Sequence, residues 1–163
     1  FYDRLGVGSG ITATLKASED DLPFAVVGVA NSESPSRRLF EDLPDVPADE
    51  RFANLAAELW WALRIRFWKT YRRATGLATS DDHPDDECIS LPNNPSLLAQ
   101  LSQPTYTRNS AGKIIVNKKG QGTKSPNDAE AVLYAFAGGA PKKSRHGAST
   151  SSRRGIHDEM STY

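Results

Sequence analysis

The longest helical pattern in the chain lies between Arg51 and Arg73, and it constrains the fold more than any other segment. Large apolar side chains recur there every three or four residues over several turns, which places them on one face of a helix. The members of this face are Phe52, Leu55, Ala56, Leu59, Trp60, Leu63 and Phe67. The pattern predicts a long helix over 51–73 that packs into the core of a folded domain.

The same segment also interleaves aromatic and cationic side chains, a combination that can bind nucleic acid. The residues concerned are Trp60, Trp61, Arg64, Arg66, Trp68, Lys69, Tyr71, Arg72 and Arg73. Because most of the large apolar residues stand at core spacing, we expect the helix to be chiefly structural. Its exposed arginines are expected to form a secondary DNA surface at most.

Shorter elements are predicted on both sides of this helix. Apolar spacing and Pro or Gly boundaries predict helices over 11–17, 95–103 and 126–137. Apolar runs predict strands over 24–29 and 88–91, and a hairpin with strands at 105–108 and 113–117. The proline-rich segment 31–49 is predicted to be a surface excursion, and 74–87 a polar, acidic loop. Alternating helices and strands of this kind predict an α/β fold.

Composition narrows the class of protein. The formal net charge is zero, so overall charge favours neither nucleic acid nor a membrane. Cys88 is the single cysteine, which excludes an internal disulfide and fits a reducing compartment. No apolar run approaches the roughly 20 residues of a membrane span, and no signal-peptide pattern opens the chain. We therefore expect a soluble intracellular protein without a membrane partner.

The ends of the chain differ from its middle. Past Gly138 the residues are mostly Lys, Ser, Arg, Gly and Thr, which predicts one domain over 1–138 and a disordered basic tail over 139–163. The chain begins at Phe1, and its only methionine is Met160. We therefore expect it to be the downstream part of a longer protein.

Two acidic segments far apart in the sequence are candidates for one metal site. The helix predicted over 126–137 opens with Asp128 and Glu130, and an acid in a first helical turn is favourably placed and rigidly held. Asp3 precedes the alternating glycines of 6–10, where Ile11 replaces the last glycine of a dinucleotide fingerprint. Each feature also has an ordinary structural explanation, as a capped helix or a frayed terminus. Periodicity leaves both Asp128 and Glu130 open as the ligand.

The acidic loop over 80–88 has the composition of a metal site but not its spacing. Neither the zinc nor the EF-hand pattern is present, so its acids are expected to be solvated. His146 and His157 lie in the predicted tail, where a catalytic role is not expected.

Four segments, in this order, resemble the carboxyl-terminal nuclease domain of the large terminase subunit of tailed bacteriophages. They are Asp3–Ile11, Phe52–Trp61, Leu97–Tyr106 and Lys124–Ala131. The resemblance implies an RNase H-like fold, a mixed sheet flanked by helices, of which this chain holds a part. It also implies an endonuclease that cuts concatemeric viral double-stranded DNA during packaging, in the bacterial cytoplasm, with two Mg²⁺ or Mn²⁺ ions.

The resemblance also assigns roles to individual residues. Asp3 corresponds to the family's second acidic ligand. Glu130 falls where the family has the aspartate of its Ser-Pro-Asp-x-Ala-Asp-Ala pattern, so it is the expected third ligand, with Asp128 in reserve. Asn127 replaces the first aspartate of that pattern, and Glu130 is one methylene longer than the usual residue. The family's first acid and its ATPase motor lie upstream of Phe1, so this fragment alone is expected to be inactive.

Partners follow from the same resemblance. The family reads DNA through phosphate contacts, for which Lys118, Lys119 and Lys124 are the candidates. The small terminase subunit and the portal are the expected protein partners. The alternative is a protein without enzymatic activity: an inactive prophage remnant, or a docking module for DNA or the packaging complex.

Overall fold

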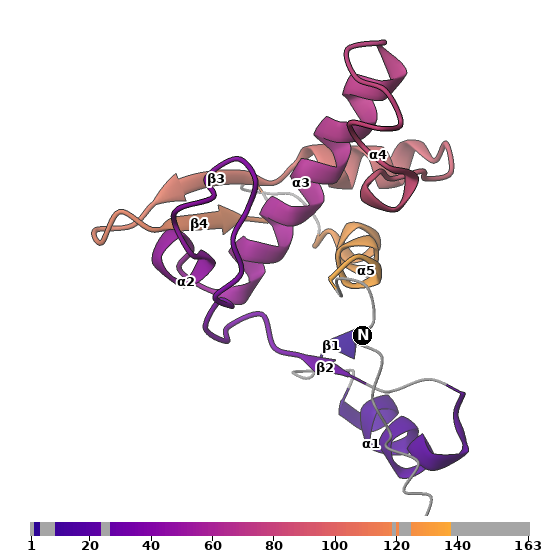
Figure 1. The fold of residues 1–163 in the computed structure, drawn as a ribbon. Coiled ribbons are helices and arrows are strands. Elements are labelled where there is room, and N and C mark those ends of the chain that lie inside the picture. Colours follow the sequence, from indigo (N-terminus) through magenta and orange to yellow (C-terminus); the bar gives the residue numbers. More distant parts are fainter. Residues whose placement is uncertain (1, 4–8, 24–26, 119, 121–124, 138–163) are drawn as a thin grey trace, which may run out of the picture.

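The computed structural model describes residues 2–3, 9–23, 27–118, 120 and 125–137 (Figure 1). Its α-helices are α1 (Ser9–Ala17), α2 (Ala48–Arg51), α3 (Leu55–Ala74), α4 (Pro95–Ser102) and α5 (Asn127–Ala135). Its strands are β1 (Tyr2–Asp3), β2 (Gly28–Val29), β3 (Thr105–Arg108) and β4 (Ile114–Asn117), and two 3₁₀ turns span Glu19–Asp21 and Asp85–Glu87. The predicted tail over 139–163 lies outside the described residues.

The predicted α/β class is confirmed, and both strand orientations occur. β1 pairs with β2 in parallel, with Tyr2 opposite Gly28 and Asp3 opposite Val29. β3 and β4 form the predicted antiparallel hairpin, in the register Tyr106 opposite Val116. Among the described residues these are two separate two-stranded sheets, with α3 running between the hairpin and α5 (Figure 1).

The helix predicted over 51–73 is interrupted near its start. Phe52 has extended backbone and forms a parallel bridge with Ile114, and Ala53 donates its amide hydrogen to the carbonyl oxygen of Ile114 at 2.9 Å. Asn54 then caps α3, because its side chain accepts from the amide of Ala57 at 2.9 Å. The apolar pattern alone does not reveal this break, since the spacing continues across it.

One buried cluster joins α3 to α5 and to β2. Its fully buried members are Val29, Leu59, Trp60, Leu63, Ile89, Ala129 and Leu133. The α3 residues belong to the predicted apolar face, so the amphipathic pattern identified the side of α3 that meets α5.

A second cluster lies under the hairpin. Its members are Phe40, Ala48, Phe52, Ala57, Trp61 and Ile114. Phe40 and Ala48 come from the segment that the sequence predicted to be a surface excursion, so that prediction was wrong for these two residues. The prolines there prevent regular structure but leave the apolar side chains free to pack.

Glu58 holds this irregular segment against α3. Its carboxylate is 2% exposed and accepts hydrogen bonds from the Ser36 amide at 2.6 Å and the Ser36 hydroxyl at 2.7 Å. The Nε atom of Arg38 lies 3.1 Å from the same carboxylate. A buried carboxylate is tolerated only when it is paired in this way, so the three contacts are required by the burial itself.

Arg51 forms a second link between the loop and the helix. Its guanidinium makes a bidentate pair with Asp42 at 2.8 and 2.7 Å and lies 4.6 Å from the ring centre of Trp61. Trp61 also donates its indole N–H to Asp42 at 3.0 Å. The hydrogen bonds from Arg51 are the main reason that the pKa of Asp42 is lowered.

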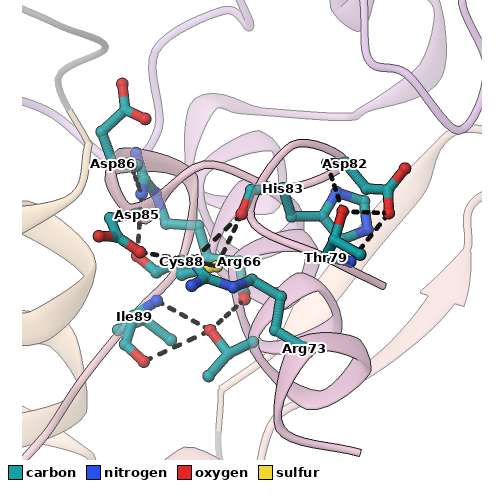
Figure 2. A network of polar contacts seen from close by, with 10 residues as sticks. Arg66, Arg73, Thr79, Asp82, His83, Asp85, Asp86, Cys88 and Ile89 are labelled. Atoms are coloured by element: carbon teal, nitrogen blue, oxygen red, sulfur yellow. Dashed lines mark hydrogen bonds and ion pairs between the residues drawn. The ribbon is translucent and has the colours of Figure 1, made fainter. Parts of the chain in front are cut away.

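The acidic segment 79–89 is bound to α3 rather than free in solvent, as Figure 2 shows. Arg66 donates to the carbonyl oxygen of Asp86 at 2.5 Å, and Arg73 pairs with Asp85 at 2.5 Å. Lys69, 6% exposed, pairs with Glu87 at 2.6 Å and with Glu41 at 2.8 Å. The Glu87 side chain is partly covered by Lys69 and is 46% exposed. The Asp85 side chain is 92% exposed although it is paired, so this acid is solvated as the sequence led us to expect.

The strand predicted over 88–91 is not formed. The amide of Ile89 instead donates to the Thr70 hydroxyl at 2.8 Å, so the backbone of this segment is satisfied by α3 (Figure 2). Within the part of the chain that the structure describes, no helix has the length and apolar character needed to cross a bilayer.

We predict that Glu58→Ala lowers the free energy of unfolding by about 3 to 5 kcal/mol, because it leaves the Ser36 donors and Arg38 without their acceptor. Urea titration followed by tryptophan fluorescence measures this loss. Glu50→Ala, at an exposed acid on α2, is the matched control and should change stability by no more than about 0.5 kcal/mol. Equal effects of the two variants would contradict the role of Glu58.

We predict that the pair of Asp42 and Arg51 makes stability depend on pH. The pKa of Asp42 is lower in the folded state than in the unfolded state. The charged Asp42 side chain therefore contributes to the free energy of unfolding above the unfolded-state pKa of about 4, and this contribution is lost as the pH falls through the folded-state pKa. The wild type should therefore be more stable than Asp42→Asn near neutral pH. That difference should shrink towards zero at about pH 2. A difference that is constant across this range in thermal melts would count against the pair.

Candidate functional site

The two acids at the start of α5 point in different directions. Ala129 and Leu133 are buried and define the inner face of this helix. Asp128 and Glu130 stand on either side of Ala129, two positions apart, and therefore about 200° apart around the axis. Burial thus separates two residues that periodicity in the sequence did not distinguish.

Asp128 faces α4. Its carboxylate accepts from the side-chain amide of Gln100 at 2.7 Å, and its backbone amide donates to the side-chain oxygen of the same Gln100 at 2.9 Å. Gln100 therefore satisfies an amide at the start of α5 that has no partner within the helix, as a capping side chain does. Asp128 itself is exposed and is held in a structural contact between two helices. The sequence analysis did not identify Gln100.

Glu130 lies on the other side of the helix and is largely buried. Its carboxylate forms an ion pair with the ammonium group of Lys118, which directly follows β4. The sequence analysis predicted Lys118 as a phosphate contact and did not foresee its position beside Glu130. α5 has to pack against the end of the hairpin before this contact exists.

Asp3 stands at the carboxyl end of β1, where its backbone pairs with Val29. The Asp3 side chain lies outside the described part of the structure. Val29 belongs to the buried cluster that also contains Ala129 of α5. β2, the strand that pairs with β1, is therefore packed in the same core as α5, the helix that carries Asp128 and Glu130. Figure 1 shows β1 and β2 next to α5.

A hydrogen bond connects the end of β2 with one face of α5. Asn31, two residues after β2, donates from its side-chain amide to the Tyr134 hydroxyl at 2.7 Å. Tyr134 lies four residues after Glu130, so the two share a face of the helix. Because β1 and β2 are parallel, their carboxyl ends lie at the same edge. The face with Glu130 is thus the one that meets this edge.

The remaining candidates are only partly described. Lys119 and Lys124 lie outside the described residues. In the described part of the chain, no group of three or more His, Cys, Asp or Glu side chains is close enough to hold a metal ion.

The candidate site combines carboxylate oxygen atoms with one cationic side chain, the Lys118 ammonium group. Carboxylates on a buried helix and at a strand end are the donors that hard divalent cations prefer. The Lys118 ammonium compensates the charge of Glu130 and holds its side chain in place.

No family model and no curated protein matches this chain. Solved structures do match. The nuclease domain of the large terminase subunit gp2 of bacterial virus Sf6 is 28% identical, with a TM-score of 0.65, over 85% of this chain and 64% of that one. Its K428A mutant with manganese and beta-thujaplicinol is 24% identical, with a TM-score of 0.70 and the same coverages. A K428A structure with calcium is 21% identical, with a TM-score of 0.61, over 82% of this chain and 62% of that one.

The chain thus spans under two thirds of the length of these domains. The likeness predicted from the four sequence segments is confirmed. In fold, this chain is similar to the nuclease domain of the large terminase subunit of a bacteriophage.

Proposed function

We propose that this chain is part of the nuclease domain of a phage large terminase subunit, a metal-dependent endonuclease that cuts double-stranded viral DNA during packaging. The observation that carries the proposal is the 28% identity to a terminase nuclease domain, with a TM-score of 0.65 over 85% of this chain. In this proposal, residues 1–138 are the partial nuclease domain, and 139–163 are a basic tail. The protein acts in the cytoplasm of the host cell, with DNA, the small terminase subunit and the portal as partners.

Asp3 and Glu130 are the proposed metal ligands, with a further acid supplied from upstream of Phe1. The contact between Tyr134 and Asn31 supports Glu130 over Asp128, because it turns the Glu130 face of α5 towards the edge that carries Asp3. The engagement of Asp128 with Gln100 supports the same choice. When bound, Mg²⁺ or Mn²⁺ ions (two in this proposal) would stabilise the charge on the attacking and leaving oxygens.

The chain's own residues position this chemistry. Burial of Ala129 and Leu133 fixes α5, and the ion pair with Lys118 orients the Glu130 carboxylate. Lys118 competes with a divalent cation for that carboxylate, and on displacement its ammonium is available to a DNA phosphate. Lys119 and Lys124 are proposed as further phosphate contacts.

A second function is a docking module without catalysis. The ion pair between Glu130 and Lys118 favours it, since that carboxylate already has a partner. In this case Glu130 holds β4 against α5 and binds no metal.

Titration of this chain with Mn²⁺ tests the ligand assignment without requiring activity. We predict that Glu130→Gln weakens Mn²⁺ binding about tenfold or more, because it removes one charged ligand. Asp128→Asn is the matched control and should bind as the wild type does. Lys118→Met should strengthen binding, because the competing ammonium is gone. The enhancement of water proton relaxation by Mn²⁺ gives the affinity.

The pattern of these variants decides between the two functions. A loss with Asp128→Asn alone would move the ligand to Asp128. Affinities that are the same in all four proteins would exclude a metal site here and favour the docking module. Circular dichroism confirms that each variant is folded.

In the longer protein that includes the upstream segment, we predict that Glu130→Ala abolishes cleavage of plasmid DNA in Mn²⁺ and leaves ATP hydrolysis unchanged, because the ligand lies in the nuclease part. The 163-residue chain itself should not cut. Agarose gels and phosphate release measure the two activities. Cleavage retained by Glu130→Ala would overturn the assignment, and robust cutting by the short chain would show that the upstream acid is dispensable.

A further inference from the structure

A hollow beside the hairpin is not explained by the nuclease site. It has a volume of about 300 Å³ and lies between α3, the end of α4 and the hairpin strands. Its apolar walls include Leu63, Phe67, Leu101 and Val116. A cavity of this size and character accommodates a branched aliphatic or aromatic side chain.

One cationic side chain at this hollow has no acidic partner among the described residues. Arg64, in the lining, stacks on Trp61 with its guanidinium carbon 4.7 Å from the ring centre and pairs with no acid in the described chain. The site therefore suits an apolar group with a negative charge next to it.

The hollow opens beside an unpaired strand edge. Thr105 and Tyr106 of β3 line it, and within the described residues β3 pairs only with β4. The Asn109 amide donates to the Lys113 carbonyl at 2.9 Å, which makes these two residues a hydrogen-bonded pair of the hairpin. Hydrogen-bonded and non-hydrogen-bonded pairs alternate along an antiparallel hairpin. The backbone N–H and C=O groups of Tyr106 and Arg108 therefore point away from β4, to the outer edge of β3. All four β3 residues are exposed, Tyr106 at 56%. This edge can receive another strand.

We propose that β3 and the adjoining hollow form a docking site for an extended acidic segment of a partner protein. The segment adds to the edge of β3, places one apolar side chain in the hollow, and directs a carboxylate two residues away towards Arg64. That spacing follows from the strand period, because residues two apart share a face. Arg108 adds a second positive charge on the same strand.

The observations favour a peptide over nucleic acid. Backbone amides at a strand edge pair with another backbone, and an apolar hollow gains most from a hydrocarbon side chain. Duplex DNA would instead contact the cations and leave the apolar hollow unused. The proposal is independent of the nuclease assignment, since Arg64 and β3 are not among the proposed ligands.

The test uses the full chain and a synthetic probe, acetyl-Thr-Leu-Thr-Asp-Thr-Thr-amide. Binding should shift the backbone amide signals of Tyr106 and Arg108 and the indole signal of Trp60 in ¹H–¹⁵N spectra. Replacing Asp in the probe by Lys, or Leu by Ser, should weaken binding about tenfold, because each removes one of the proposed contacts. Two further probes, each N-methylated at every second residue but in opposite phase, should differ in affinity. Only one of them loses the N–H groups that face β3, so only that probe should bind more weakly.

Protein variants complete the test. Arg64→Gln should weaken binding about tenfold. Arg72→Gln is the matched control, an arginine of the same helix stacked on Trp68 at 4.9 Å but outside the hollow, and it should leave affinity unchanged. The proposal fails if no shift occurs at about 1 mM probe, or if Arg64→Gln and Arg72→Gln behave alike. It also fails if a short DNA duplex, and not the peptide, shifts these signals in an Arg64-dependent way.

Discussion

The burial of the Glu58 carboxylate is the constraint on which the rest of the structure depends. An ionised group in the core requires partners, and Ser36 and Arg38 are the groups that supply them. Their engagement places the irregular segment over 31–49 on α3 and brings Phe40 and Ala48 into the second cluster. The hairpin then packs on that cluster through Ile114. A polar contact thus determines where an apolar core forms.

The same logic governs the candidate site. Every group that positions α5 comes from another part of the chain: Gln100 from α4, Lys118 from the end of β4, and Asn31 from the segment after β2. These contacts give Asp128 and Glu130 different environments although they share one helical turn. Because of that difference we propose a structural role for the first and a ligand role for the second, and the nuclease proposal depends on this choice.

Much of the fold was predictable because it follows from local patterns. The apolar spacing in 51–73 identified the inner face of α3, and the Asn109–Gly112 turn, with Gly112 at φ +76°, identified the hairpin. Predictions failed where tertiary contacts override such patterns. The bridge between Phe52 and Ile114 interrupts the helix, and Thr70 takes the amide of Ile89 that a strand would have used. Neither partner can be read from nearby residues.

By itself the sequence determined the α/β class, the candidate acids Asp3, Asp128 and Glu130, and the likeness to terminase nuclease domains. Periodicity, residue type and the order of segments can all be read along the chain without knowledge of tertiary contacts. Only the tertiary structure decided that Glu130 faces Lys118 and that Asp128 faces Gln100. It alone placed the unpaired edge of β3 beside an apolar hollow. The two pairings join residues 12 and 28 positions apart, and their free energy arises only when the intervening chain has folded.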